Sequence, residues 1–415
     1  MKKFILKSLV GLGLAAAMLT GCSVADISID KGGAYDRYDA VAPGEASIDG
    51  GAYGDVSGDP YDGGETGENP QQPFPSGVVT AAEWNDVANW SFWANLLNNQ
   101  DWAKYESHWK YYPHNFAYVE TTDTEGKPVC GVPVVLMKDG QKVWKAVSDN
   151  SGKVVLWTSL YDADYKIDAA GYTIVADGKE YSDVLFTTPN KSELQVNKVL
   201  VKTNKVDNAI DVAFIVDATG SMGDEIGFLK ADLEDIVKLV GQQCTATVRT
   251  GTVFYRDEGD EYVTKYSQFT TSVKETVTYI GQQRAEGGGD WPEAVHMALE
   301  TGIQKLQWND DARSRVAFLI LDAPPHHEDA IIASCQKSIE AYAASGIKVI
   351  PVAASGIDKA CEFLLRSFAL STNGTYVFIT NDSGVGDMHI EATVGQYEVE
   401  KLRDLIARLI IAYAK

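Results

Sequence analysis

The chain has 415 residues, with 58 acidic against 36 basic side chains and a formal net charge of −22 at pH 7. This length allows more than one domain with its own buried core. So strong a negative field, with no basic patch and no basic run interleaved with aromatic residues, argues against nucleic acid as a partner and favours the recruitment of cations.

Residues 1–21 have the pattern of a bacterial secretory signal peptide. Lys2 and Lys3 precede an apolar run that ends in small residues and is too short to stay in a membrane as a span. The segment Leu19-Thr20-Gly21-Cys22 resembles the lipobox of lipoproteins. This resemblance implies that Cys22 begins the mature chain and carries lipid, which would anchor the protein in the bacterial envelope, at the outer membrane or the cell surface. The alternative is an ordinary cleaved signal followed by an unmodified cysteine.

Residues 22–78 are rich in Gly, Asp, Tyr and Pro, contain few aliphatic side chains and show no helical or strand period. Such a composition cannot bury enough apolar surface to offset the entropy lost on ordering. We therefore expect a flexible acidic tether that lifts the rest of the protein from the membrane. An alternative is that its tyrosines, as in the repeated Gly33-Ala34-Tyr35 and Gly51-Ala52-Tyr53, form a docking motif.

Residues 79–113 are the part of the chain densest in tryptophan. Thr80 and Glu83 have the spacing of a capping box, and the apolar positions that follow lie roughly on one helix face. The pattern predicts a Trp-rich helical segment that packs its rings onto the next domain, although an aromatic cage for carbohydrate is an alternative. The five tryptophans are Trp84, Trp90, Trp93, Trp102 and Trp109.

Residues 114–202 change to short β-favouring runs separated by turn signals. Asp139-Gly140 is typical of a hairpin turn, and Asp149-Asn150-Ser151-Gly152 marks a second turn. This spacing predicts a small all-β sandwich N-terminal to the last domain. The segment from Gly131 to Gly152 resembles the transthyretin-like, carboxypeptidase-regulatory type of β-sandwich.

Residues 206–415 alternate between β and α patterns and form the last predicted domain. Such alternation implies an α/β fold, with helices on both faces of a doubly wound, mainly parallel sheet. The predicted strands are 211–217, 246–255, 316–321, 347–353 and 375–379, with an edge hairpin at 262–266. The first predicted helix starts at 226, and the others span 292–306, 328–344, 357–369 and 402–413.

Three oxygen-bearing side chains, Asp217, Thr219 and Ser221, follow the first of these strands and precede its helix. Open α/β sheets place their ligands at this edge, outside the carboxyl ends of the strands. Mg²⁺ takes oxygen ligands, uses few carboxylates and keeps several waters. The alternating Asp-x-Thr-x-Ser pattern presents three oxygens on one side of a tight loop, which suits such an ion.

This loop resembles the metal-ion-dependent adhesion site of von Willebrand factor type A domains, whose pattern is Asp-x-Ser/Thr-x-Ser. The segment 287–294 resembles the second metal loop of that family, and 318–326 resembles its third. The resemblance implies that Asp217, Thr219 and Ser221 hold Mg²⁺ or Mn²⁺. It also places Asp322 beside the ion, either as a ligand or through a coordinated water.

The second metal loop departs from the family pattern, because the family supplies a threonine there and this chain offers Asp290 after three glycines. With Asp217 and Asp322, three carboxylates would then face one ion. Without a cation they would repel one another, so either a divalent cation binds or one carboxylate takes up a proton. Asp290 is also placed to cap a helix that begins at Pro292, a role compatible with metal binding.

The family resemblance implies a binding protein rather than an enzyme, with a protein ligand whose acidic side chain completes the coordination of the metal. One alternative is a scaffold subunit of an envelope complex in which the metal is purely structural, and another is a metal-dependent hydrolase. A phosphotransferase of the haloacid dehalogenase kind would need an aspartate where Thr219 stands. No Ser/His/Asp set or nucleophilic cysteine stands out in the sequence.

Four further patterns are weaker candidates. Adjacent histidines in 326–329 point apart, which argues against a zinc site there. The segment 255–257 ends the second strand, and it is either a rim for an acidic ligand or an Arg–Asp pair that fixes a loop. Trp291 is a contact residue or a lid over a helix start. Cys335 and Cys361 are a disulfide candidate or simply buried small residues.

Overall fold

The computed structural model describes residues 76–289, 291–383 and 389–415, which all belong to one compact unit, Glu68–Lys415. The predicted signal peptide, Cys22, nearly all of the tether and Asp290 lie outside the described residues, so those predictions are untouched by the structure. None of the described helices is long and apolar enough to cross a membrane.

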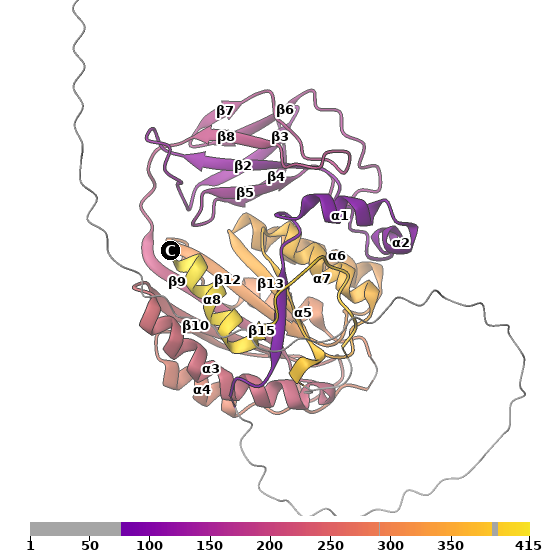
Figure 1. Ribbon diagram of the computed structural model, residues 1–415, viewed down its shortest axis with the longest axis vertical. Coiled ribbons are helices and arrows are strands. Elements are labelled where there is room, and N and C mark those ends of the chain that lie inside the picture. The colour runs from indigo at the N-terminus through magenta and orange to yellow at the C-terminus, as the bar shows by residue number, and fades with distance from the viewer. Residues whose placement is uncertain (1–75, 290, 384–388) are drawn as a thin grey trace, which may run out of the picture. The chain divides into compact units, whose positions relative to one another are not determined.

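An eight-stranded sheet organises the larger part of the fold, in the order β11-β10-β9-β12-β13-β14-β1-β15 (Figure 1). Five strands are parallel: β9 Asp207–Asp217, β10 Thr247–Tyr255, β12 Ala312–Leu321, β13 Ile347–Ala353 and β14 Tyr376–Ile379. The antiparallel edges are formed by β11 Thr264–Thr270 on one side and by β1 Thr80–Trp84 with β15 Glu400–Lys401 on the other.

Helices cover both faces of this sheet, because its central strand is buried on both faces. Val212, Phe214 and Val216 of β9 pack with α3, α4 and α8, whereas Ala213 and Ile215 pack in the cluster that contains α5, α6 and α7. The helix bounds are α3 Gly223–Gln243, α4 Val273–Gly281, α5 Val295–Gln304, α6 Asp329–Ala344, α7 Lys359–Ser371 and α8 Leu402–Ala414. The predicted doubly wound, mainly parallel α/β fold is confirmed.

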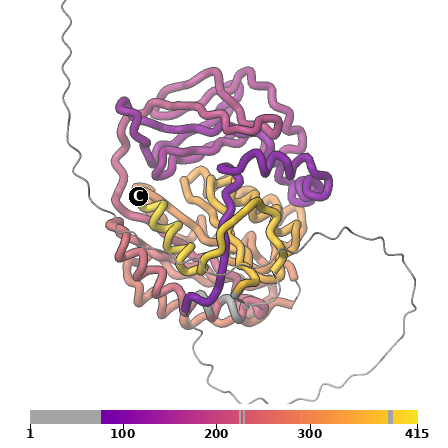
Figure 2. Tube along the Cα trace, in the orientation of Figure 1, coloured from indigo at the N-terminus to yellow at the C-terminus, as the bar shows by residue number. Residues whose placement is uncertain are grey.

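The segment before the small sheets contributes a strand to the large one, which corrects the prediction of a capped helix at Thr80 and Glu83. These two residues lie in β1, whose Ala81–Trp84 pair antiparallel with β14. Figure 2 shows this indigo segment running beside the yellow C-terminal part of the chain, where β1 also pairs with β15. The large sheet therefore draws a strand from outside residues 206–415.

The tryptophans of this segment pack inward, in agreement with the prediction of ring packing and not with an exposed carbohydrate cage. All five are at most 8% exposed. Helices α1 Trp90–Leu97 and α2 Gln100–Trp109 bring Trp93 and Trp102 against Phe363 of α7, with ring centroids 5.8 and 5.7 Å away. The indole of Trp109 donates a hydrogen bond to the carbonyl of Ala360 at 2.7 Å.

A buried arginine links the same segment to α7. Arg366 donates from Nε and Nη2 to the carboxylate of Asp86 at 2.9 and 2.6 Å, and it lies 3.4 Å from Glu362. Its guanidinium also lies 4.8 Å from the ring centre of Trp93. A planar guanidinium suits this bidentate and stacked environment, where its charge is both paired and covered by an aromatic face.

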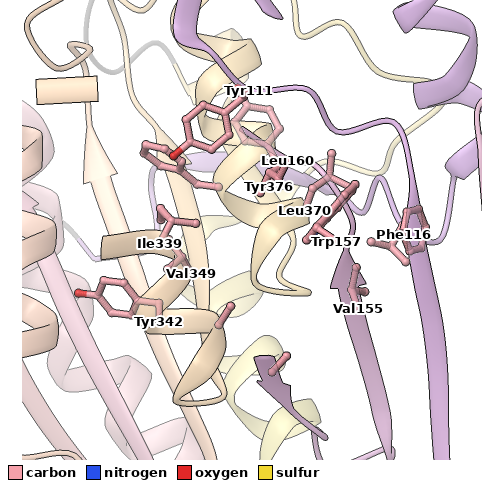
Figure 3. Packing of buried hydrophobic residues seen from close by; sticks show 14 of the residues in the cluster. Tyr111, Phe116, Val155, Trp157, Leu160, Ile339, Tyr342, Val349, Leu370 and Tyr376 are labelled. Atoms are coloured by element: carbon pink, nitrogen blue, oxygen red, sulfur yellow. The ribbon is translucent and has the colours of Figure 1, made fainter. Parts of the chain in front are cut away.

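Two further sheets lie between β1 and β9 in the chain. Their orders are β5-β2-β8 and β4-β3-β6-β7, and Asp139 and Gly140 form the predicted turn between β3 and β4 with positive φ values of 48° and 78°. Figure 3 shows Trp157 of β5 and Tyr376 of β14 among the residues of one hydrophobic cluster. The strands are β2 Phe116–Thr122, β3 Pro133–Lys138, β4 Gln141–Val147, β5 Lys153–Trp157, β6 Tyr172–Ala176, β7 Lys179–Tyr181 and β8 Val196–Leu200. The transthyretin-like type stays a prediction.

Cys335 and Cys361 are buried free thiols, and Cys130 and Cys244 are partly buried free thiols. The described residues therefore contain no disulfide. Burial raises the pKa of the Cys335 thiol to about 12. Between the two alternatives left by the sequence, the structure has buried, unpaired cysteines.

We expect Arg366→Met to lower the free energy of unfolding by about 3–5 kcal/mol, because removing one partner leaves the carboxylate of Asp86 buried without its cation, and leaves Glu362 with only the part-exposed Lys359. Denaturant titration of the full chain measures this change. Arg408→Ala is the matched control, since Arg408 also pairs with this segment, through Glu83, but is 47% exposed and should contribute at most about 1 kcal/mol. Equal effects of the two substitutions would contradict the assigned role of Arg366.

Candidate metal centre

The oxygen-bearing side chains of the first predicted metal loop lie on one turn after β9. Asp217 ends β9 and is fully buried, and its Oδ1 accepts hydrogen bonds from the backbone N–H of Thr219 at 2.9 Å and from its hydroxyl at 2.7 Å. The hydroxyl of Ser221, an exposed residue in a short 3₁₀ turn, lies 3.4 Å from that of Thr219. The three predicted oxygen donors are therefore grouped on one turn.

The second loop lies directly against the first. The N–H of Glu286 donates to the carbonyl of Ala218, and the N–H of Gly220 donates to the carbonyl of Gly287, both at 3.1 Å. Gly288 has a φ of +73°, and a Cβ there would lie 3.2 Å from Thr219 Cβ. Glycine is favoured at this position because its φ lies where other residues are strained and because a Cβ would be crowded against Thr219.

The third loop joins the other two through Glu293. Asp322 follows β12 and is buried, and two residues later the carbonyl of Pro324 accepts a hydrogen bond from the N–H of Glu293 at 2.9 Å. This contact corrects the predicted start of the helix at Pro292, because Glu293 is bonded across to the third loop and α5 begins only at Val295. The structure thus brings Asp217, Thr219, Ser221 and Asp322 to one edge of the sheet. Asp290 lies outside the described residues.

Mutual repulsion and burial perturb the carboxyl groups of this edge. Burial, followed by the nearby charge of Asp322, raises the pKa of Asp217 to about 7. Burial, followed by the charges of Asp217 and further acids, raises the pKa of Glu293 to about 9. The buried hydroxyl of Tyr255 faces Asp217, but its geometry falls short of a hydrogen bond. Raised pKa values of this kind favour the protonated, neutral form, and perturbed carboxyl groups cluster at functional sites.

The donor set fits a hard divalent cation. Asp217 Oδ2 and Glu293 Oε2 are buried and accept no hydrogen bond from the described residues. Within the same residues no three His, Cys, Asp or Glu side chains are grouped as metal ligands. A cation here would therefore need the hydroxyls of Thr219 and Ser221 beside the carboxylates, which suits Mg²⁺ or Mn²⁺ better than a metal that prefers nitrogen or sulfur.

Glu293 is the member of this site that the sequence analysis missed. A helix beginning at Pro292 would place Glu293 in its first turn, where acidic residues are ordinary, so the side chain attracted no attention. Its position directly after a glycine-rich loop and a proline was the available signal.

The structure shows the surroundings of the weaker candidates. His326 Nε2 lies 2.8 Å from Asp257 Oδ1, and His327 Nε2 lies 2.7 Å from the carbonyl oxygen of His108. The two histidines therefore point to different partners, as the argument against zinc predicted. Arg256 is buried and donates to the carbonyl of Arg284 at 2.9 Å, so it forms neither an exposed rim nor a pair with Asp257. Trp291 is 46% exposed beside the second loop.

Comparison with known proteins identifies the family of the domain that contains this edge of the sheet. Residues 211–362 match the family model of the von Willebrand factor A domain. This range contains Asp217, Thr219, Ser221, Glu293 and Asp322, and it spans most of the large sheet. The chain therefore contains a von Willebrand factor A domain, with the α/β fold described above.

Two curated relatives match this chain over short stretches. A putative ariadne-like RING finger protein of Acanthamoeba polyphaga mimivirus is 32% identical over 120 residues, which cover 29% of this chain and 11% of that protein. Alpha-protein kinase vwkA of Dictyostelium discoideum is 33% identical over 134 residues, covering 31% and 21%. The chain thus spans about a tenth to a fifth of the length of these relatives.

Solved structures resemble the chain only distantly. The pilus adhesin SpaC from Lactobacillus rhamnosus GG in its open conformation is 13% identical, with a TM-score of 0.35 over 51% of this chain and 31% of that one. A second structure of the same adhesin gives a TM-score of 0.34.

The carboxyl groups predict an unusual pH dependence for the metal-free protein. Their pKa values rise on folding, from 3.8 to about 7 for Asp217 and from 4.5 to about 9 for Glu293. Between the unfolded and the folded pKa of each group, the folded state binds more protons than the unfolded state. The free energy of unfolding therefore falls as the pH rises through this window. Denaturant titration in EDTA should show this fall between about pH 7 and about pH 8.5, where Glu293 dominates.

Glu293→Gln is the matched variant for this measurement, because it keeps the shape of the side chain and removes its titration. Its stability should depend less on pH than that of the unsubstituted protein over the same range. Parallel pH profiles of the two proteins would show that Glu293 is not held protonated in the metal-free fold.

Proposed function

We propose that this protein is a binding protein whose von Willebrand factor A domain holds Mg²⁺ or Mn²⁺ and, through the metal, a protein ligand. The observation that carries the proposal is the pair of buried carboxylate oxygens on Asp217 and Glu293 that accept no hydrogen bond from the described residues. They lie where three loops meet, beside the hydroxyls of Thr219 and Ser221. The presence of the domain itself supports a binding or adhesion role.

The residues of the site have separable roles in this proposal. Asp217 and Glu293 supply negative charge, Thr219 and Ser221 supply neutral oxygens, and Asp322 lies behind them as a ligand or as the acceptor for a coordinated water. The hydrogen bond from Thr219 to Asp217 Oδ1 orients that carboxylate and leaves Oδ2 for the cation. A bound metal would supply an open position for an acidic side chain of the protein ligand. Binding, not catalysis, is the proposed activity.

Divalent cations should stabilise the full chain, because a ligand that binds only the folded state adds about 2.7 kcal/mol at a hundredfold excess over its dissociation constant. We expect Mg²⁺ or Mn²⁺ at millimolar concentration to raise the melting temperature and EDTA to reverse the rise. Ca²⁺ should act more weakly, because it prefers more protein oxygens than this turn offers. Calorimetric titration of the metals into the full chain measures the same binding directly.

Asp217→Ala should abolish the metal effect while leaving the metal-free protein as stable as before or more so, since it also relieves repulsion with Asp322. Asp404→Ala is the control, because Asp404 is a half-exposed acid on α8. The absence of both binding heat and thermal shift with Mg²⁺ and Mn²⁺ would overturn the proposal and leave only the fold.

We also propose that lipid on Cys22 anchors the protein in a bacterial envelope, at the outer membrane or the cell surface. The support is the lipobox-like Leu19-Thr20-Gly21-Cys22 after an apolar signal segment. Cys22→Ser should move the protein from the membrane fraction to the soluble fraction in a fractionation experiment. If the variant still sediments with membranes after a high-salt wash, the anchor is elsewhere.

A further inference from the structure

A groove of about 530 Å³ adjoins the candidate metal centre, between α2 and the second and third metal loops. Its lining is mostly apolar, with Lys104 and Asp358 as charged residues, and most of the other residues are aromatic or proline. They are Tyr105, Trp109, Trp291, Pro292, Pro324 and Pro325.

The walls of the groove are continuous with the metal loops. Pro292 immediately precedes Glu293, and Pro324 follows Asp322 by two residues. The hydrogen bond from Glu293 N–H to the carbonyl of Pro324 ties these two walls together at 2.9 Å. An extended peptide advances about 3.3–3.6 Å per residue. A ligand whose carboxylate reaches the metal would therefore place a nearby residue of the same segment in this groove.

The third wall comes from outside the α/β part and is held by a stacked pair of histidines. The rings of His108 and His327 are nearly parallel, with centroids 3.8 Å apart, and His327 Nε2 lies 2.7 Å from the carbonyl oxygen of His108. The contact fixes the end of α2 against the third metal loop. The groove is therefore formed by fixed elements and is available without rearrangement, which lowers the entropy lost when a ligand binds.

The surface of the groove indicates the chemistry of its occupant. Trp291 stands at the groove 46% exposed, and exposed tryptophans are common anchors of protein interfaces. Lys104 is exposed with its ammonium 5.0 Å from the ring centre of Tyr105, and among the described residues it forms no ion pair. The acid of the lining, Asp358, is engaged as the N-cap of α7, where it accepts a hydrogen bond from the N–H of Cys361 at 2.7 Å. Lys104 is thus the charge left to complement an acidic segment that carries a large apolar side chain. A lining that is rich in proline and has few hydrogen-bonding groups suits such a peptide segment better than it suits a carbohydrate.

We propose that this groove binds an aromatic or other large apolar side chain of an extended acidic segment in the protein partner, next to the carboxylate that reaches the metal. The inference rests on the proposed metal-dependent function and specifies which kind of protein segment that site would select. Trp291 and the prolines provide the apolar contact, and Lys104 pairs with a further acid of the same segment.

The test uses the full chain and fluorescein-labelled synthetic peptides that hold one aspartate and one phenylalanine, separated by zero to two glycines within an acidic sequence. Fluorescence anisotropy with Mn²⁺ should show binding for at least one spacing, and EDTA should abolish it. Replacing the phenylalanine of that peptide by alanine, or introducing Trp291→Ala, should weaken binding about tenfold or more. Lys104→Glu should also weaken binding.

Tyr266→Ala is the matched control variant, because Tyr266 is 43% exposed on the edge strand β11, outside the groove. It should leave peptide binding unchanged. Calorimetric titration with Mn²⁺ should give the same metal affinity for Trp291→Ala and the unsubstituted protein, which separates loss of the groove from loss of the metal.

The outcomes distinguish the two proposals. If Mn²⁺ binds but no peptide does, or if Trp291→Ala and Tyr266→Ala bind the peptide equally well, the groove inference is overturned and the metal proposal stands. Peptide binding that persists in EDTA also overturns the link between groove and metal. If Mn²⁺ does not bind to the full chain, the proposed function fails and this inference fails with it.

Discussion

The fully buried carboxylate of Asp217 is the constraint on which the arrangement of this domain depends. It ends the central strand β9, where both faces of the sheet are covered by helices, so water cannot solvate its charge. Thr219 satisfies one of its oxygens with two hydrogen bonds. The other oxygen accepts no hydrogen bond from the described residues, and the nearby charge of Asp322 acts on the same carboxyl group. An uncompensated charge in such a place is unfavourable. A proton or a cation must therefore complete the site.

The loops around Asp217 are shaped by this requirement. The second loop approaches through glycines, since a Cβ on Gly288 would be crowded by Thr219 and Glu293. The third loop is tied to the second by one backbone hydrogen bond, between Glu293 and Pro324. These contacts bring backbone close to the carboxylates on two sides while Ser221 stays exposed on a third. Asp217, Glu293 and the hydroxyls of Thr219 and Ser221 would hold the proposed cation there.

The parallel core was predictable from the sequence because its signals are local. The strand 347–353 was predicted with the bounds that the structure has, since a buried parallel strand is a continuous apolar run between polar turns. The first metal loop was predictable for a similar reason, because its three donors lie within five residues and their geometry follows from one turn. The proximity of Asp217 and Asp322 depends on β9 and β12 being neighbours in the sheet, and this strand order was expected only from the family resemblance.

The parts that the sequence did not reveal depend on contacts between distant residues. Thr80–Trp84 is too short for its period to distinguish a strand from the first turn of a helix, and its pairing partner β14 lies about 300 residues away. Glu293 was hidden because a proline usually opens a helix, whereas here a hydrogen bond to Pro324 delays α5 until Val295. The burial of Arg256 likewise follows from the packing of loops that its local sequence does not specify.

The division between the domain and its N-terminal segment bears on how specificity arises. The family match spans 211–362, which contains the metal loops and the prolines of the groove but not α2 at Gln100–Trp109. Tyr105 and Trp109 reach the groove only because Trp93, Trp102 and Arg366 hold their segment against α7. The proposed metal ligands thus lie inside the range of the family match, and the third wall of the groove lies outside it. A partner that touches both would be selected by its carboxylate at the metal and by its apolar side chain at α2, so changes in the segment 79–113 would alter specificity without disturbing the metal.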